Sequence, residues 1–327
     1  MPQVSIIVPC FNEENTIGLL LEALVTQTFP IQETEVIIAD GLSSDATRQR
    51  VAEFQQEHPD LRVRVVDNVK RTIPAGLNTA IAAAQGEFLV RLDAHSMPQQ
   101  DYVARCVEAL QSGKGDNVGG VWQIRAGGPG WQAGAIAAAA AHPLGVGDAH
   151  YRFTAQAQWV DTVPFGAFRR DWVARIGPFN EDLLTNEDYE FNVRLRQAGG
   201  KVWLDPSIRS VYFARSNLAQ LARQYWRYGY WKARMLRRYP GTIRWRQALP
   251  PVFVLSLIGL PLLALFLPCA GWAFVLELAI YTLILLAAGI QLAVRQREIV
   301  FIFGVPLAIA TMHVAWGSAF LWSLMDR

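Results

Sequence analysis

Residues 4–24 read VSIIVPCFNEENTIGLLLEAL, a short apolar run followed by a polar turn and a segment with helical spacing. A continuous apolar run of this length, bounded by turn residues, is typical of a buried strand, here expected at 4–9. The segment after it should form a helix over 15–28, because its apolar residues recur on one face, at Ile17, Leu20, Leu21 and Leu24.

The same strand–helix unit repeats along the chain. Further strands are expected at 35–39, 63–67 and 87–92, and further helices near 46–58, 76–84 and 102–111. Such alternation predicts an α/β fold, a Rossmann-like and mostly parallel sheet with helices on both faces. Ligands bind at the carboxyl ends of the strands in such sheets. Pro9, Asp40 and Asp93 follow three of the expected strands, so we expect the site there.

The composition is that of a folded protein with an uneven distribution of charge. Of the 327 residues, 52% are hydrophobic and 18% charged, which excludes disordered and collagen-like proteins. Residues 1–215 hold 19 basic and 25 acidic residues, whereas 216–248 hold 8 basic residues and no acid. The three cysteines show no CxxC spacing, which argues against a disulfide framework and a cysteine-based zinc site.

Three apolar segments, 249–268, 272–294 and 299–324, make up the C-terminal part of the chain. Each has about the 20 apolar residues that a transmembrane helix needs, and together they contain one acid, Glu277. We expect three transmembrane helices; the alternative is three buried helices of a large soluble core. Basic residues precede the first segment and follow the second, at Arg295 and Arg297. The positive-inside rule then predicts a multi-pass protein of the inner (plasma) membrane, with a cytoplasmic N-terminal domain and the C-terminus on the other side.

The chain is therefore expected to have three parts: a catalytic domain at 1–215, a basic aromatic region at 216–248, and the transmembrane helices at 249–327. The basic aromatic region carries seven Tyr and Trp residues among its arginines. This composition on an amphipathic helix favours the lipid headgroup layer. Nucleic-acid binding uses a similar composition. The adjoining apolar segments favour membrane lipids as the partner, and no nucleic acid is expected.

The residues at the strand ends suggest how a phosphate-bearing ligand is held. Neither G-x-G-x-x-G nor a P-loop follows the first strand, which excludes a standard dinucleotide or P-loop site. A diphosphate held without such loops usually needs a divalent cation and carboxylates. Asp93 and His95 are candidate metal ligands, because residues two apart in extended chain point the same way. As alternatives, Asp93 could cap the next helix and Asp40 could serve only as a turn residue.

A second acidic cluster, Asn186-Glu187-Asp188, precedes a segment whose basic residues come later. One interpretation is an acidic first turn favoured by the helix dipole. The other is a carboxylate placed at a helix start to act as general base. The residues alone leave both open.

Four ordered stretches resemble the family 2 inverting glycosyltransferases, which have the GT-A fold: SIIVPCFNEENTI, EVIIADGLSSDAT, GEFLVRLDAH and NEDYEFNVRLRQAG. The resemblance covers about residues 1–240. It implies sugar transfer from a UDP-sugar with a divalent cation, Mn²⁺ or Mg²⁺. The later stretches DTVPFGAFRRD and QYWRYGYWKARMLRRYP, with the membrane tail, are most similar to the succinoglycan glucosyltransferases, which extend a lipid-linked oligosaccharide at the cytoplasmic face.

The resemblance also implies roles for individual residues. Asp188 would be the general base, and Asp93 and His95 would bind the metal, His95 standing where the D-x-D motif has its last acid. Nucleotide-sugar binding would fall to Pro9, Phe11, Asn12, Glu13, Asp40, Arg71 and Asp93. Contact with the acceptor or the diphosphate would fall to Glu187, Arg169, Gln224, Arg227 and Tyr228. The last three form Q-x-x-R-Y, which resembles the Q-x-x-R-W motif of processive synthases.

These roles predict a membrane-bound hexosyltransferase of exopolysaccharide or cell-surface glycan synthesis. It would move glucose or a similar sugar from a UDP-sugar to a polyprenyl-diphosphate-linked oligosaccharide, with inversion, since one carboxylate base and no enzymic nucleophile give a single displacement. One alternative is a polyprenyl-monophosphate glycosyltransferase. The other is a non-catalytic membrane assembly subunit, against which the presence of Asp40, Asp93 and Asp188 together argues. The oligomeric state stays open.

Overall fold

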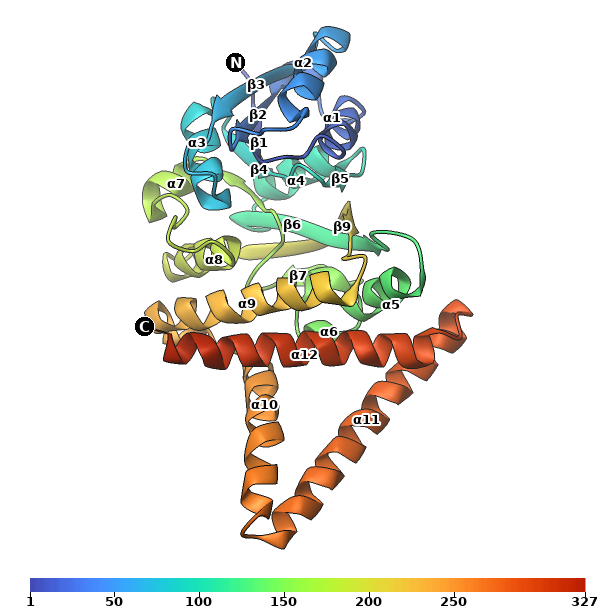
Figure 1. Cartoon of the computed structure of the whole chain (residues 1–327). Coiled ribbons are helices and arrows are strands. Elements are labelled where there is room, and N and C mark those ends of the chain that lie inside the picture. The colour runs from blue at the N-terminus through green and yellow to red at the C-terminus, as the bar shows by residue number, and fades with distance from the viewer. Residues whose placement is uncertain (327) are drawn as a thin grey trace. The chain divides into compact units, whose positions relative to one another are not determined.

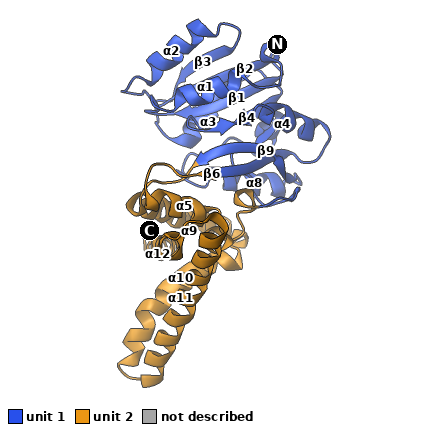
Figure 2. Ribbon diagram, turned by 90° about the vertical axis from the view of Figure 1, so that its right-hand side faces the viewer, with its two compact units in different colours: residues 1–123, 154–212 blue, residues 124–153, 213–327 orange. Residues whose placement is uncertain are grey.

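The protein is described here by a computed structural model, which covers residues 1–326 and falls into two compact units (Figure 2). Unit 1 consists of residues 1–123 and 154–212, and unit 2 of residues 124–153 and the chain from 213 onward. The expected catalytic domain, 1–215, differs from unit 1 by residues 213–215 and, chiefly, by the segment 124–153. This segment leaves the sheet and packs with the C-terminal helices, a long-range contact that the order of residues does not reveal.

Unit 1 begins with the parallel half of a sheet, in the order β3-β2-β1-β4 (Figure 1). The expected strands and helices are confirmed to within a few residues. The strands are β1 (Val4–Cys10), β2 (Thr34–Asp40), β3 (Arg62–Asp67) and β4 (Phe88–Arg91). The helices are α1 (Ile17–Val25), α2 (Thr47–Glu57), α3 (Ile73–Ala83) and α4 (Tyr102–Gln111), with a 3₁₀ turn η1 at Ile31–Glu33.

The second half of the sheet makes it mixed rather than mostly parallel. Beyond β4 the order continues through β8 (Ala167–Arg169), β6 (Asn117–Arg125), β9 (Val202–Phe213) and β5 (Met97–Pro98), and β7 (Gln158–Trp159) also pairs with β9. β8 is antiparallel to β4 and β6, and β9 is antiparallel to β5 and β7. The helices α7 (Asp171–Ile176) and α8 (Glu187–Gln197) lie between β8 and β9 in the chain. These strands are short or rich in polar residues, so they lack the apolar run that identified the first four.

The core of unit 1 explains why its polar chemistry collects at the strand ends. Every residue of β1 and β2 is buried. Parallel strands covered on both faces are near-continuous apolar runs. A polar side chain of these strands therefore meets solvent or ligand mainly where the strand ends, as at Asp40.

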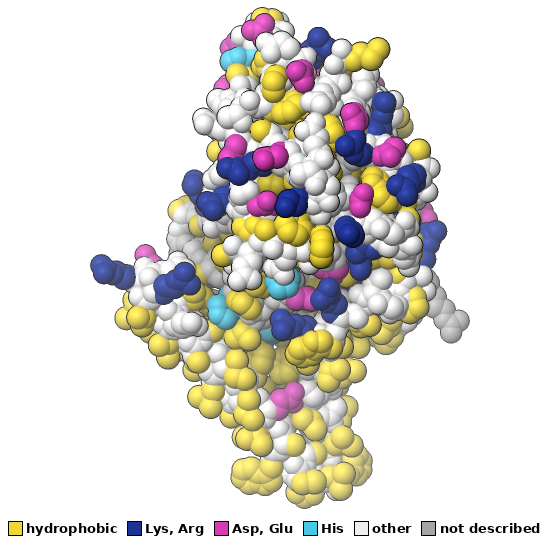
Figure 3. Space-filling view, turned by 180° about the vertical axis from the view of Figure 1, so that it is seen from behind, with side chains coloured by type: hydrophobic (Ala, Val, Ile, Leu, Met, Phe, Trp, Pro, Cys, Tyr) yellow, Lys and Arg dark blue, Asp and Glu magenta, His cyan; other side chains and the backbone are white. Residues whose placement is uncertain are grey.

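Unit 2 is helical apart from the ends of β6 and β9. It contains α5 (Trp131–Ala140), α6 (Pro143–Val146), η2 (His150–Arg152), α9 (Leu218–Arg238), η3 (Pro240–Thr242), α10 (Trp245–Ala264), α11 (Pro268–Gln296) and α12 (Phe301–Met325). The last three helices coincide with the predicted apolar segments, and each is long and apolar enough to cross a membrane. Apolar side chains predominate on the surface of the hairpin of α10 and α11, with acidic atoms among them (Figure 3).

Candidate active site

The carboxyl ends of the parallel strands bring the predicted nucleotide-binding residues to one edge of the sheet. Cys10 at the end of β1 is paired with Asp40 at the end of β2, and Asp40 with Asp67 at the end of β3. Pro9 lies one residue earlier, beside Ala39. The loops after these strands therefore start side by side, where ligands bind in sheets of this kind.

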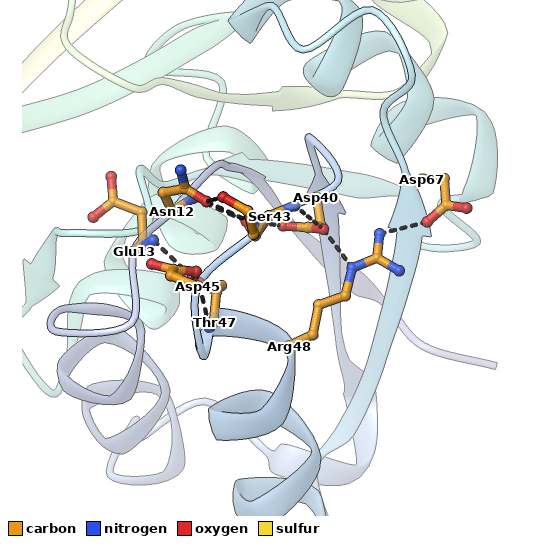
Figure 4. A network of polar contacts seen from close by, with 9 residues as sticks. Asn12, Glu13, Asp40, Ser43, Asp45, Thr47, Arg48 and Asp67 are labelled. Atoms are coloured by element: carbon orange, nitrogen blue, oxygen red, sulfur yellow. Dashed lines mark hydrogen bonds and ion pairs between the residues drawn. The ribbon is translucent and has the colours of Figure 1, made fainter.

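Asp40 is the centre of a network of polar contacts at this edge (Figure 4). Its side chain is only 1% exposed. Oδ2 accepts hydrogen bonds from Arg48 Nε at 2.5 Å and from the backbone N–H of Ser43 at 3.0 Å, and Oδ1 accepts one from the Ser43 hydroxyl at 2.5 Å. Arg48 also donates to Asp67 at 2.5 Å, so one guanidinium joins the ends of β2 and β3. The three hydrogen bonds that Asp40 accepts from Arg48 and Ser43 fix the orientation of its carboxylate at the end of β2.

The loop after β1 is tied to the loop after β2 by hydrogen bonds. Asn12 has φ of 54°, in the left-handed region that asparagine tolerates better than most residues. Its backbone N–H donates to Ser43 Oγ at 2.8 Å, and its side-chain oxygen accepts from the backbone N–H of Ser44 at 2.9 Å. The backbone N–H of Glu13 donates to the hydroxyl of Thr47 at 2.7 Å. These bonds, rather than burial, position Asn12 and Glu13 at the strand ends.

Phe11 and Arg71 lie on the outside of this network. Phe11 is 45% exposed. A Cβ added to Gly41 would lie 3.0 Å from the Phe11 ring, so the absence of a side chain at Gly41 leaves space for that ring. The Arg71 guanidinium carbon lies 6.0 Å from the ring centre. An exposed aromatic ring beside a cation suits a stacked base and a phosphate.

A second cluster of charges joins β4 to the start of α8. Arg91, the last residue of β4, is buried; its Nη2 donates to Glu187 Oε1 at 2.8 Å and lies 3.4 Å from Asp93 Oδ1. Burial acts to lower the pKa of Arg91, but the charges of these two carboxylates and of Asp188 raise it above its ordinary value. One guanidinium thus connects the aspartate predicted to bind metal with the acid pair predicted for catalysis.

Asp188 lies in the first turn of α8, after Asn186, which has φ of 68°. Burial of the carboxyl raises its pKa to about 6, and the negative charge of Glu187 adds to the shift. The charge of Arg91 and the backbone N–H of Tyr189, which donates to Asp188 Oδ1 at 2.7 Å, act in the opposite direction. A general base works best with a pKa near the working pH. Asp188 is therefore ionised at neutral pH and still basic enough to accept a proton.

His95 connects the strand ends to the loop after β1. Its Nδ1 lies 3.0 Å from Glu13 Oε1. Burial acts to raise the pKa of Glu13, but hydrogen bonds from His95 and Thr16 hold it below its ordinary value. Glu13 is therefore a carboxylate at neutral pH, and it orients the ring that follows Asp93 by two residues.

The donor set around Asp93 fits a divalent cation that a substrate helps to hold. Among residues 1–326, no group of three or more His, Cys, Asp and Glu side chains is arranged as a complete metal site. The Asp93 carboxylate is 25% exposed and the His95 ring 49% exposed, so both can reach a ligand. Mg²⁺ and similar ions are commonly bound by one or two carboxylates together with the phosphates of a substrate. The residues therefore fit a cation that binds with the nucleotide.

Comparison with known proteins identifies the family. The model of glycosyl transferase family 2 matches residues 5–177. The succinoglycan biosynthesis protein ExoA of Rhizobium meliloti (strain 1021) is 31% identical over 325 residues, which is 98% of this chain and 94% of that protein. The chain belongs to glycosyltransferase family 2. The predicted family and the predicted transferase activity are confirmed.

Other relatives of this family 2 protein extend the comparison. A transferase of Methanococcus voltae is 28% identical over 95% of this chain and 93% of its own length; it is named as acting on dolichyl N-acetylglucosaminyl phosphate. A mannosyltransferase of Pyrobaculum calidifontis, solved with GDP-mannose and Mn²⁺, covers all of this chain and 88% of its own at a TM-score of 0.64 and 23% identity. TarS of S. aureus, solved with UDP-GlcNAc, covers all of this chain at a TM-score of 0.52 and 16% identity. These structures confirm the predicted GT-A-like fold.

One predicted residue of the family 2 domain lies away from both clusters. Arg169 is opposite Phe88, at the amino end of β4, whereas Asp93 follows the carboxyl end of the same strand. Five residues of extended chain separate the two positions by about 16 Å. Arg169 pairs with Glu87 and lies over the Phe88 ring. The direction of β4 therefore places Arg169 at the opposite end of that strand from Asp93, and its role at the acceptor or diphosphate stays a prediction.

The other predicted acceptor residues lie in two places. Glu187 lies in the second cluster, paired with Arg91. Gln224, Arg227 and Tyr228 lie on α9 in unit 2, where the Gln224 amide donates to the Tyr228 hydroxyl at 2.9 Å. Their role toward an acceptor stays a prediction.

Sequence reasoning missed Arg91 and Arg48, which organise the two clusters. A signal for Arg91 was present, because an arginine inside an apolar strand is almost never fully buried unless it is paired. Arg48 gave no comparable signal. It lies in the first turn of α2, and only the folded chain shows that it reaches both Asp40 and Asp67.

Proposed function

We propose that this protein is a membrane-anchored inverting glycosyltransferase that transfers a sugar from a UDP-sugar to a lipid-linked acceptor. The acceptor we propose is a polyprenyl-diphosphate-linked oligosaccharide, and the pathway exopolysaccharide or cell-surface glycan synthesis. The observation that carries the proposal is the pair of clusters in unit 1. One is built around the buried carboxylate of Asp40, and the other holds a carboxyl, Asp188, whose pKa is raised to about 6.

The first cluster supports a nucleotide as the donor's leaving group. A carboxylate can accept about four hydrogen bonds, so that of Asp40 suits a ring N–H as a further donor, such as the imide of uracil. Phe11 offers an exposed ring on which the base can stack, and Arg71 offers a cation for the diphosphate. Asn12 and Glu13 keep this loop in place through their bonds to Ser43 and Thr47.

The second cluster supports direct displacement at the anomeric carbon. Asp188 takes the proton of the acceptor hydroxyl as that oxygen attacks, and the bond from the sugar to the diphosphate breaks on the opposite side. Arg91 holds Glu187 and Asp93 in place, because it lies between them and pairs with both. A single base and no covalent intermediate give inversion.

A divalent cation fits this scheme, with Asp93 and His95 as its protein ligands. When bound, such an ion neutralises charge that develops on the diphosphate. The task of this chain is then to present the Asp93 carboxylate and to orient His95 through Glu13.

The lipid-linked nature of the acceptor is supported by unit 2 and by the relatives. Three helices of unit 2 are long and apolar enough to cross a membrane. One relative is named for succinoglycan biosynthesis and the other for transfer to a dolichyl-phosphate-linked sugar. The basic residues of α9 favour the cytoplasmic side of the plasma membrane for unit 2, by the positive-inside rule.

A donor panel tests the proposal. Purified full-length protein in lipid is supplied with radiolabelled UDP-glucose, other UDP-sugars or GDP-mannose, and with lipid extracts as acceptor. Release of UDP together with label in the lipid fraction is expected, and EDTA should abolish both. Transfer from GDP-mannose alone, or full transfer in excess EDTA, would contradict the proposed donor or the proposed cation.

The same assay separates the acceptor classes. Label in an oligosaccharide released from the lipid by mild acid supports a lipid-diphosphate-linked oligosaccharide. A single labelled sugar on polyprenyl phosphate would instead establish the lipid monophosphate itself as acceptor. The Asp188→Asn variant, prepared in the same way, is the control for contaminating transferases.

A further inference from the structure

The last helix, α12, is apolar enough to cross a membrane, yet it lies against parts of unit 2 that precede the hairpin. At its start, Phe301 lies 3.5 Å from where a Cβ of Gly134 in α5 would be. In its middle, His313 Nε2 lies 2.8 Å from the carbonyl oxygen of Leu144 in α6. Farther along, the Trp316 carbonyl oxygen would lie 2.2 Å from a Cβ on Gly229 of α9, so the two helices touch backbone to backbone.

The end of α12 is held to α9 by hydrogen bonds and an ion pair. The Tyr230 hydroxyl donates to Asp326 Oδ2 at 2.5 Å, and Arg234 lies 3.4 Å from the same oxygen. Arg237 donates to the Asp326 carbonyl at 2.8 Å and to the carbonyl of Ser323. The pKa of Asp326 is lowered, chiefly by the Tyr230 hydrogen bond. The C-terminal end of α12 is thus fixed beside the second half of α9.

The charge of α9 decides on which side of the membrane both ends of α12 lie. α9 carries six basic residues in 21 positions: Arg223, Arg227, Lys232, Arg234, Arg237 and Arg238. A helix with that many charges does not cross a bilayer. α12 runs alongside α9 and crosswise to α10 and α11 (Figure 1). Both of its ends are therefore on the side where α9 lies.

We propose that α12 lies in the plane of the membrane interface, and that only α10 and α11 cross the bilayer, as a hairpin. Val305, Ile309 and Met312 are fully buried on the face of α12 that packs against the protein. Another face presents large apolar side chains at helical spacing, among them Phe303 at 73% and Trp322 at 56% exposure. The apolar chemistry of this face suits lipid acyl chains as its partner.

The hairpin has the length that this arrangement requires. Its two arms meet α12 at two separate places, α11 at the start of the helix and α10 in its second half, since the Ile302 carbonyl lies against Gly289 and the Pro250 carbonyl against Gly317. From Pro250 to Ala264, where α10 ends, the chain descends about 21 Å at the helical rise of 1.5 Å per residue. An in-plane helix sits about 5–10 Å deep. The descent of the hairpin and the depth of α12 together come to about 30 Å, which is the thickness of the hydrocarbon core.

The topology is tested with single cysteines in full-length protein. Cys269, the exposed native thiol, is first replaced by serine; Cys10 and Cys106 are buried. One reporter is Glu298→Cys in the connection between α11 and α12, and the other is a cysteine appended after Arg327. A membrane-impermeant maleimide is applied to sealed right-side-out and inside-out vesicles. Labelling of both reporters from the same face supports the in-plane helix, and labelling from opposite faces overturns it.

A cross-link provides a second measurement that does not depend on maleimide access. Arg234→Cys with Asp326→Cys should be joined by a short bis-maleimide in intact membranes. A helix α12 that crossed the bilayer would carry Asp326 away from Arg234, and no cross-link would form. The matched control pairs Arg223→Cys with Asp326→Cys, because Arg223 lies three turns away along α9, about 16 Å.

Discussion

At the scale of single residues, the catalytic role proposed for Asp188 comes with a cost in stability. Its pKa of about 6 means that the folded protein resists ionising a carboxyl that ionises near 3.8 in the unfolded chain. A raised pKa makes the Asp188 carboxylate a stronger base. The same shift means that forming this carboxylate costs free energy in the folded protein. Such carboxyls are common at catalytic sites.

Replacing Asp188 with asparagine should separate chemistry from binding. Asp188→Asn is expected to reduce kcat by about 10²–10⁴-fold, the usual cost of losing a general base. UDP affinity should stay within a few-fold of normal, because Asp40 and Phe11 belong to the other cluster. Turnover and UDP titration on the same preparation measure both. Near-normal turnover would remove Asp188 from the mechanism.

The same variant should be more stable than the natural protein, in a way that depends on pH. Because the folded pKa is raised, ionisation of Asp188 destabilises the folded state progressively from pH 4 to pH 6 and fully above it. At pH 7.5 the free energy of unfolding of Asp188→Asn should therefore be higher than that of the natural protein by roughly 3 kcal/mol, given 1.36 kcal/mol per pKa unit over about two units. Thermal unfolding in detergent at pH 7.5 and pH 4.5 measures this gain. An equal gain at both pH values would contradict the assigned pKa shift.

Arg91 should set the pH at which the enzyme loses activity. Its charge lowers the pKa of Asp188, so Arg91→Met should move the acidic limb of the kcat/KM profile above pH 6. Breaking a buried ion pair also costs about 3–5 kcal/mol of stability. Arg91→Lys keeps the charge and should show a smaller displacement of the limb. A profile unchanged in both variants would contradict the coupling.

At the scale of elements, α9 and α12 approach through a glycine. A Cβ on Gly229 would lie 2.2 Å from the Trp316 carbonyl oxygen, and backbone cannot move aside as a flexible side chain would. Gly229→Ala should therefore destabilise unit 2 by about 1–3 kcal/mol, the usual cost of overpacking. The melting temperature in detergent measures it.

The matched control for that substitution is Gly259→Ala in α10. Nothing lies within 4 Å of a Cβ at this position. Alanine favours a helix over glycine by about 1 kcal/mol, so this variant should be unchanged or slightly more stable. Equal destabilisation by both substitutions would show that the loss of stability in Gly229→Ala does not arise from the contact between α9 and α12.

At the scale of the whole molecule, the protein should behave as an integral membrane protein rather than as one bound by charge. The hairpin exposes large apolar side chains along α10 and α11, such as Leu255, Leu262 and Leu283. Salt screens the attraction of α9 for anionic lipids within about 3 Å at 1 M but leaves the hydrophobic effect in place. We expect 1 M NaCl and alkaline carbonate to leave the protein in membranes, and detergent to release it. Release by salt alone would show that the hairpin does not insert.

Local patterns in the sequence determined a large part of this picture. The apolar runs of β1, β2 and β4 are buried on both faces, so their composition alone identifies them as strands. The polar residues that end them, Asp40 and Asp93, follow from the same alternation. The three C-terminal apolar segments are helices because length and composition suffice for that conclusion.

Tertiary structure decided what depends on residues far apart in the chain. Arg91 reaches Glu187 across 96 positions, and no periodicity reports such a pair. The direction of β4 decided that Arg169 lies at the opposite end of that strand from Asp93. The antiparallel strands extended a sheet whose later members lack an apolar signature. Composition measures how apolar α12 is, but its position depends on the charged helix against which it packs. The reason is that hydropathy is a property of neighbouring residues, whereas ion pairing and helix packing depend on contacts between residues far apart in the chain.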